Sequence, residues 1–267
     1  MEFIKVALLG IIQGITEWLP ISSTGHLILA DEFIHLTGSD EFKYLFNVVV
    51  QLGSILAVVV LYWSTLNPFK RDRNERMVCL RLWAKVLVAS IPAAIVGLML
   101  DDIVDEHLSV WYVIAAALFI YGVLYIIIEK KLKIKVRIRD TESVSYMDAL
   151  KLGVLQMLAL IPGTSRSGST ILGGMLLGFD RTVAAQFSFF MAIPVMAGAS
   201  LLRLLKSGLA LTGQEWVLLV FGTFVSFLVS LVVIRKLVSF VKSHDFSPFG
   251  VYRIILSLLI VIYFLAF

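Results

Sequence analysis

Charged residues and cysteine are both scarce in this chain of 267 residues. Asp, Glu, Lys and Arg together account for only 16% of it, whereas 59% is hydrophobic and the mean hydropathy is +0.93. That balance is far from the composition of a soluble domain, so we expect the protein to reside in a lipid bilayer. Cys79 is the single cysteine, which excludes an intrachain disulfide and argues against a thiolate metal site or thiol redox chemistry. No small-residue cleavage site follows the first apolar run, so we expect that run to stay in the protein.

Six apolar stretches are long enough to cross a bilayer, which takes about 20 apolar residues. We expect membrane spans near 44–63, 84–100, 110–128, 184–205, 216–234 and 249–267. The basic residues gather in loops between these spans, and the loop after 100 is acidic (Asp101, Asp102, Asp105 and Glu106). By the positive-inside rule the basic loops are cytoplasmic and the acidic loop is outside. The net charge of +4 therefore marks topology, and we expect no nucleic-acid partner.

Two stretches of the chain resemble each other and indicate a duplication. Gly10 and Gln13 correspond to Gly153 and Gln156, and a few residues later Ser22, Thr24 and Gly25 correspond to Ser165, Ser167 and Gly168. Each copy runs from an apolar helix into a proline, then into hydroxyl residues and glycine, then into a second short apolar helix. These helix pairs are too short to span, so each is predicted to dip into the membrane and return on the same side. Non-helical backbone at membrane depth must be buried in protein or line a wet cavity, so each turn should face a pocket.

Loop charge predicts that the two copies enter the membrane from opposite faces. The fold class expected is therefore an all-α polytopic membrane protein with two inverted repeats, each a re-entrant helix–loop–helix followed by three transmembrane helices. The repeats cover about 1–128 and 147–267 of a single membrane domain spanning 1–267. Inverted repeats with broken helices are typical of transporters, and they also suit an enzyme that acts on a lipid headgroup.

The second turn has the composition of a phosphate site. Arg166 lies among hydroxyl and glycine residues where a helix is predicted to begin; the neighbours that could bind substrate are Ser165, Ser167, Gly168 and Thr170. Free N–H groups at a helix start attract anions, and the guanidinium group matches phosphate oxygens in a two-pronged contact. The alternative is that these small residues only cap helices and allow close packing, but a cation inside a membrane usually marks function.

The first turn supplies groups for catalysis. Glu17, Ser23 and His26 offer a base or metal ligand, a nucleophilic hydroxyl and a titratable imidazole, with the hydroxyls of Ser22 and Thr24 beside them. Glu17 and Gln13 are also hard oxygen ligands of the kind that a divalent cation, Mg²⁺ or Ca²⁺, takes. Two oxygens are few for a metal site. Glu17 could instead pair with Arg166 across the two repeats, and both interpretations stay open here.

The stretches QGITEWLPISSTGH and PGTSRSGST resemble the two signature motifs of the bacterial undecaprenyl-diphosphate phosphatases of the bacitracin-resistance type. FNVVVQLGSILAVV and FSFFMAIP are similar to further segments of that family, so the resemblance covers nearly the whole chain. The first family motif has Glu or Gln, three residues, then Glu; here Gln13 occupies the variable place and Glu17 the fixed one.

The resemblance implies hydrolysis of undecaprenyl diphosphate to undecaprenyl phosphate and inorganic phosphate, which recycles the carrier lipid of cell-wall synthesis and confers bacitracin resistance. It assigns Glu17, Ser23 and His26 to catalysis and Ser165, Arg166 and Thr170 to the diphosphate. Ser23 is our preferred nucleophile, with attack by water or by His26 as alternatives. The resemblance also implies a bacterial inner-membrane enzyme acting on the periplasmic side. The partners expected are the prenyl diphosphate lipid, the bilayer and a second copy of the chain in a homodimer; the competing function is a transporter or flippase for an anionic lipid.

Overall fold

The computed structural model describes residues 1–207 and 211–266, and the side chains at 44, 101–103, 105, 203, 206 and 207 lie outside that description. The described part is helical throughout apart from its connections and one isolated β-bridge. Its elements in chain order are α1 (Glu2–Thr16), α2 (Ser23–Asp31), α3 (Asp40–Leu61), α4 (Trp63–Leu66), α5 (Arg73–Ile103), the π-helix η1 (Val104–Leu108), α6 (Trp111–Lys130), α7 (Tyr146–Gln156), the 3₁₀-helix η2 (Met157–Leu160), α8 (Arg166–Leu176), α9 (Arg181–Ser207), α10 (Gly213–Val241) and α11 (Ser247–Ala266).

Six helices are long and apolar enough to cross a membrane, namely α3, α5, α6, α9, α10 and α11. This confirms the all-α polytopic fold class. Two of these helices are longer than the sequence predicted, because α5 already begins at Arg73 and α10 continues to Val241. Basic residues that we assigned to loops, such as Arg76 and Arg235, therefore lie on helical turns. Lys and Arg form helices well and extend their charged ends to the interface, so charge alone does not mark where a span ends.

The acidic segment after the second span is also more helical than expected. Residues 101–103 complete α5, and η1 follows at 104–108. The side chains of Asp101, Asp102 and Asp105, on which the outside assignment partly rests, lie outside the described residues. The assignment of this segment to the outer face stays a prediction.

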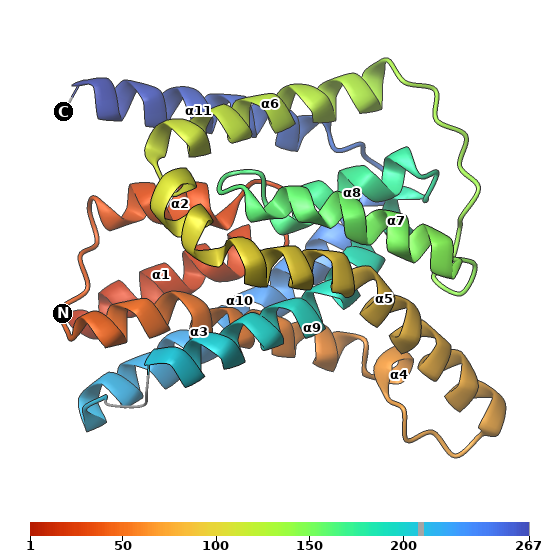
Figure 1. Cartoon of the computed structure of the whole chain (residues 1–267), viewed down its shortest axis with the longest axis horizontal. Coiled ribbons are helices and arrows are strands. Elements are labelled where there is room, and N and C mark those ends of the chain that lie inside the picture. Colours follow the sequence, from red (N-terminus) through yellow and green to blue (C-terminus); the bar gives the residue numbers. More distant parts are fainter. Residues whose placement is uncertain (208–210, 267) are drawn as a thin grey trace.

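The helices are arranged around the two short helix pairs (Figure 1). α6 and α11 pack against each other along one side of the molecule, while α3, α9 and α10 form the opposite side. The contacts follow the duplication, in which α1, α3 and α5 correspond to α7, α9 and α10. α1 packs on α10 and α7 packs on α5; likewise α3 packs on α10 and α9 packs on α5. α1–α2 and α7–α8 are thereby held in the middle, where their turns meet. The opposite orientation of the repeats in a bilayer stays a prediction.

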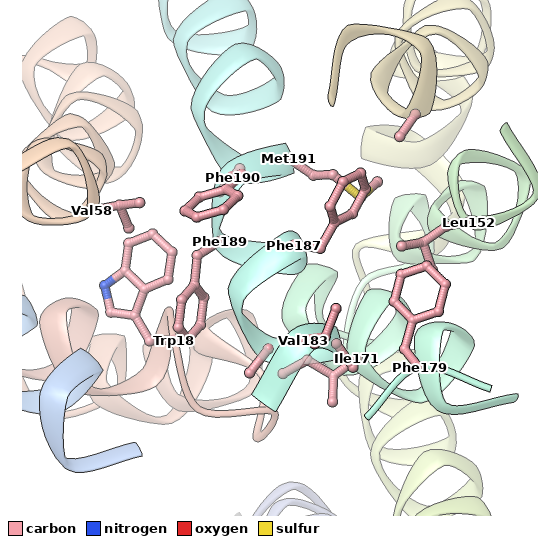
Figure 2. Packing of buried hydrophobic residues seen from close by; sticks show 14 of the residues in the cluster. Trp18, Val58, Leu152, Ile171, Phe179, Val183, Phe187, Phe189, Phe190 and Met191 are labelled. Atoms are coloured by element: carbon pink, nitrogen blue, oxygen red, sulfur yellow. The ribbon is translucent and has the colours of Figure 1, made fainter. Parts of the chain in front are cut away.

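The largest hydrophobic cluster surrounds the middle of α9 (Figure 2). Phe187, Phe189, Phe190 and Met191 are almost completely buried there. The ring of Trp18, from the turn after α1, packs edge-on against Phe189, with the ring centroids 5.2 Å apart. This contact anchors the first turn to the core, so the catalytic candidates on either side of Trp18 are attached to a rigid helix.

Candidate active site

The two turns share an unusual backbone. Ser22 and Ser165, which correspond in the duplicated sequence, both have φ of 72°, and among the described residues no other non-glycine residue has a positive φ. Each is the N-cap of the following helix: Ser22 Oγ accepts a hydrogen bond from Gly25 N at 3.3 Å, and Ser165 Oγ accepts one from Gly168 N at 3.1 Å. Such conformations cost about 1–3 kcal/mol and persist where the surroundings enforce them, commonly at active sites. The two equivalent turns place the first residues of α2 and α8 at one pocket.

A pocket of about 250 Å³ lies between the turns, and residues of α3, α5, α7, η2 and α9 also line it. Five residues selected from the sequence line it: Glu17, Ser23 and Thr24 from the first turn, and Ser165 and Arg166 from the second. The rest of the lining is mainly apolar, including Ala93, Val195 and Met196. The pocket therefore joins a polar floor built from both repeats to a hydrophobic wall.

An ion pair links the two turns at the pocket. Arg166 Nη2 donates to Glu17 Oε1 at 2.8 Å, and the side chains are only 12% and 7% exposed. The other carboxylate oxygen, Glu17 Oε2, accepts a hydrogen bond from Gln13 Nε2 at 2.8 Å. The pairing that the sequence left as one of two alternatives is thus present. Each carboxylate oxygen of Glu17 therefore already accepts one hydrogen bond from a side chain, and its second lone pair is left for another donor.

Arg166 is also bound to α9. Its Nη1 donates to Ser188 O at 3.0 Å, and its guanidinium carbon lies 5.4 Å from the centre of the Trp18 ring. Thr170 does not line the pocket. Its hydroxyl lies 2.6 Å from Ser188 Oγ, and this contact fixes Ser188, which in turn binds Arg166. Arg166 Nε is buried and has no hydrogen-bond partner among the described residues. One donor of the guanidinium group therefore has no partner in the described part of the chain.

Ser22, Ser167 and Gly168 are buried parts of the turns and do not line the pocket. Ser167 Oγ lies 3.1 Å from Glu17 O and 3.2 Å from Leu19 O, so the second turn is hydrogen-bonded to the backbone of the first. Gly168 O accepts a hydrogen bond from Tyr125 on α6 at 2.9 Å. These residues hold the turns together, whereas Ser23, Thr24 and Ser165 are the hydroxyls at the pocket.

His26 lies one turn after Ser23 on α2 but does not line the pocket. Its Nδ1 is 2.7 Å from Ser22 O, and its Nε2 is 2.6 Å from Tyr252 Oη on α11. A carbonyl oxygen only accepts, so Nδ1 carries the proton and, in the neutral ring, Nε2 accepts from the Tyr252 hydroxyl. The rings of His26 and Tyr252 are also stacked, with centroids 5.5 Å apart. No pattern in the sequence indicates Tyr252 as a partner of His26.

Glu17 and Gln13 also fit the proposal of a divalent cation. Gln13 Oε1 is buried and accepts no hydrogen bond from any described residue, and it belongs to the side chain whose amide group contacts Glu17. An unpaired amide oxygen beside a carboxylate is a donor set of the hard type that Mg²⁺ and Ca²⁺ prefer. In the described part of the chain no group of three or more His, Cys, Asp and Glu residues could hold a metal on its own. Further ligands would have to come from substrate and water.

Comparison with known proteins gives a consistent family. Residues 6–259 match the family model described as bacitracin resistance protein BacA. The chain belongs to this family. The undecaprenyl-diphosphatase of Acetivibrio thermocellus is 52% identical over 269 residues, which cover 100% of this chain and 99% of that protein. The undecaprenyl-diphosphatase of Enterococcus faecalis is 50% identical over 267 residues, covering 98% of this chain and 97% of the relative.

Several polar residues at the centre of this BacA-family protein were not selected from its sequence. Gln51 and Gln156 line the pocket, and Gln156 Oε1 is buried without a partner in the described part of the chain. Arg253 is fully buried and donates to the backbone of both turns. A signal for Arg253 was available, because it is an arginine within an apolar run long enough to span the membrane. Gln156 had a signal too, because it corresponds to Gln13 in the duplicated motif, whereas Gln51 had none.

Proposed function

We propose that this chain hydrolyses the terminal phosphoanhydride bond of undecaprenyl diphosphate and releases inorganic phosphate and undecaprenyl phosphate. The observation that carries this function is the meeting of Ser23 and Arg166, one from each motif, in a single pocket with an apolar wall. The undecaprenyl-diphosphatases at 50% identity or above over nearly the whole chain support the same activity. Recycling of the carrier lipid and bacitracin resistance follow from this reaction.

The diphosphate binds through charge at the second turn. The start of α8 offers backbone N–H groups and the positive end of the helix dipole to a phosphate oxygen. Arg166 adds a guanidinium group whose Nε is free among the described residues. When the terminal phosphoryl group arrives, its oxygens compete with Glu17 for Arg166. Arg166 then stabilises the charge that develops on the transferred phosphoryl group, which is the main catalytic task in such reactions.

The same exchange activates the nucleophile. Glu17, released from Arg166, accepts the proton of Ser23 as Ser23 Oγ attacks the terminal phosphorus. The bond from that phosphorus to the bridging oxygen breaks, and its electron pair leaves with undecaprenyl phosphate. A water molecule then attacks the phosphoserine, so inorganic phosphate is released and Ser23 recovers its proton. We assign His26, one turn from Ser23 and hydrogen-bonded to the half-exposed Tyr252, to proton exchange with the surroundings.

We also propose that Glu17 and Gln13 take part in holding a divalent cation, Mg²⁺ or Ca²⁺. Bound there, the cation would neutralise diphosphate charge. The unpaired Gln13 Oε1 supports this assignment. In the cell we place the protein in the bacterial inner membrane with the pocket open to the periplasm, as the family resemblance implies and as the loop charges allow. Association into a homodimer belongs to the same proposal.

The test is phosphate release from undecaprenyl diphosphate by the purified protein in detergent, with added Mg²⁺ or Ca²⁺. Arg166→Ala should lower kcat by about a thousandfold, since it removes a charge that acts on the transition state. Ser23→Ala should abolish the phosphoserine step, and Ser243→Ala, an exposed serine after α10, is the matched hydroxyl deletion that should retain full activity.

The outcomes separate the alternatives. A Ser23→Ala protein with normal turnover would show that water attacks directly, and the hydrolase function would stand without the phosphoserine. An unmodified protein that binds the lipid but releases no phosphate would contradict the hydrolase function. That result would favour a transporter or flippase, because transport needs only the binding groups of the two turns.

A further inference from the structure

Arg253 lies at the centre of the molecule and has no part in the reaction described above. It belongs to α11, and its side chain is fully buried. Its Nη1 donates to Pro20 O at 3.2 Å, and its Nη2 donates to Gly163 O at 2.8 Å and to Thr164 O at 3.0 Å. One guanidinium group thus binds the backbone of the first turn and the backbone of the second turn.

These carbonyl groups need a partner that the helices do not provide. Pro20 lies between α1 and α2, and Gly163 and Thr164 lie between η2 and α8, so all three residues are outside regular helix. A buried carbonyl without a hydrogen bond costs about 1–3 kcal/mol, and lipid cannot supply the bond. The planar guanidinium group has several donors in fixed directions, which suits it to acceptors on two segments.

No carboxylate pairs with Arg253 among the described residues, although the other guanidinium group at the turns, that of Arg166, has one. The face of the Tyr121 ring, 5.3 Å from the guanidinium carbon, supports the group instead. Arg253, Arg166 and Glu17 together leave one unit of positive charge around the pocket. An uncompensated buried charge is costly, so a residue that served packing alone would be cheaper as an apolar side chain.

The bonds of Arg253 lie close in sequence to the reacting groups on both sides. Pro20 precedes Ser23 by three residues, and Thr164 precedes Arg166 by two. We propose that Arg253 is a positioning residue for phosphoryl transfer: it fixes the distance between the turn that carries the nucleophile and the turn that holds the phosphoryl group. This inference rests on the proposed hydrolase function. Arg253 does not line the pocket.

Kinetics of Arg253→Lys test the proposal. Lysine keeps the charge but places its donors on one nitrogen, so it cannot hold the two turns in the same fork. A displacement of about 1 Å between reacting groups costs up to about a hundredfold in rate. We expect kcat per folded molecule to fall by about that factor while KM changes little, because Ser165 and Arg166 still bind the diphosphate. The number of folded molecules is measured by size exclusion and by the cooperative thermal transition.

Arg181→Lys is the matched control. Arg181 is also bonded to a buried side chain, that of Glu129, with Nη2 and Oε2 2.6 Å apart, but it does not line the pocket. Its variant should lower the melting temperature and leave kcat per folded molecule unchanged. If Arg253→Lys behaves in the same way, with unchanged kcat, the positioning role is wrong and Arg253 serves stability alone.

A gentler variant keeps the proposal testable if Arg253→Lys does not fold. Tyr121→Leu retains the guanidinium group and its three acceptors. It removes the ring that supports the guanidinium group and the hydroxyl that accepts a hydrogen bond from Ser169. It should lower kcat in the same direction by a smaller factor, and unchanged kcat in a folded Tyr121→Leu protein would count against positioning. An unmodified protein without phosphate release contradicts the hydrolase function itself, whereas an active protein with active variants contradicts only the role of Arg253.

Discussion

Glu17 and Arg166 are 149 residues apart in the chain and form a hydrogen-bonded ion pair, with Nη2 and Oε1 2.8 Å apart. The pair holds the two turns together and keeps both the candidate base and the candidate phosphate ligand occupied. In the proposed mechanism, substrate displaces Glu17 from Arg166 and so frees the base and the phosphate ligand in one event. Without substrate the two side chains stay paired, because each charge alone would be costly in a low-dielectric environment.

The first prediction concerns the stability of this pair. Glu17→Gln and Arg166→Met should each lower the free energy of unfolding by about 3–5 kcal/mol, because each leaves the other charge buried and unpaired. The double variant should be more stable than either single variant or equal to it, since no charge is then left alone. Thermal and denaturant unfolding in one detergent give the comparison, and strictly additive losses in the double variant would contradict an energetic coupling of the two residues.

The sequence predicted most of the frame and part of the site. The apolar runs located the six spans, and the repeated motif identified two turns whose N-cap residues, Ser22 and Ser165, do have the same backbone conformation. Helix starts were predicted less well, as α5 shows, because charged residues tolerate both helix and loop. Ser23 and Arg166 reach one pocket as expected, whereas His26 turns to Tyr252. The contact between His26 and Tyr252 depends on how α2 packs on α11, and no local sequence pattern predicts the packing of helices that are distant in the chain.

The second prediction concerns the long connection between α6 and α7. Arg137 in this connection donates to Asp148 on the first turn of α7, and this bond holds the pKa of the Asp148 carboxyl group below its usual value. A lowered pKa gives stability that is present above the ordinary Asp pKa and is lost as pH falls through the lower folded-state value. Arg137→Met should therefore be less stable than the unmodified protein at neutral pH. In acid the difference should shrink to the part that comes from losing the hydrogen bond of Arg137 Nε to Leu177 O.

Melting temperatures measured from neutral pH to about pH 2, below the ordinary Asp value of about 3.9, would test this dependence. Arg139→Met is the control, because Arg139 is exposed in the same connection and has no hydrogen bond to Asp148. Its melting temperature should follow that of the unmodified protein throughout. A difference for Arg137→Met that persists unchanged in acid would exclude the ion pair as its origin.

The third prediction concerns the cation. Gln13→Glu places a second carboxylate beside Glu17, so without a divalent cation the like charges should lower the melting temperature. Added Mg²⁺ should restore it and should half-saturate phosphate release at a lower concentration than in the unmodified protein, because a second charged oxygen ligand strengthens binding. Gln214→Glu is the control, because Gln214 is exposed near the start of α10 and does not line the pocket. An identical response of both variants to Mg²⁺ would contradict a site at Gln13 and Glu17.

The fourth prediction tests the helix crossing that carries Arg253. A Cβ atom on Gly122 of α6 would lie 2.7 Å from Gly250 O on α11, and one on Gly250 would lie 2.7 Å from Gly122 O. Gly122→Ala should therefore push α11 away and displace Arg253, with lower stability and lower kcat as a result. Gly198→Ala on α9, where a Cβ would meet nothing within 4 Å, should be neutral or raise stability by up to about 1 kcal/mol through helix propensity. Unfolding and phosphate release measured on both variants decide the matter, because equal effects of the two alanines would show that the close approach of α6 and α11 does not control the turns.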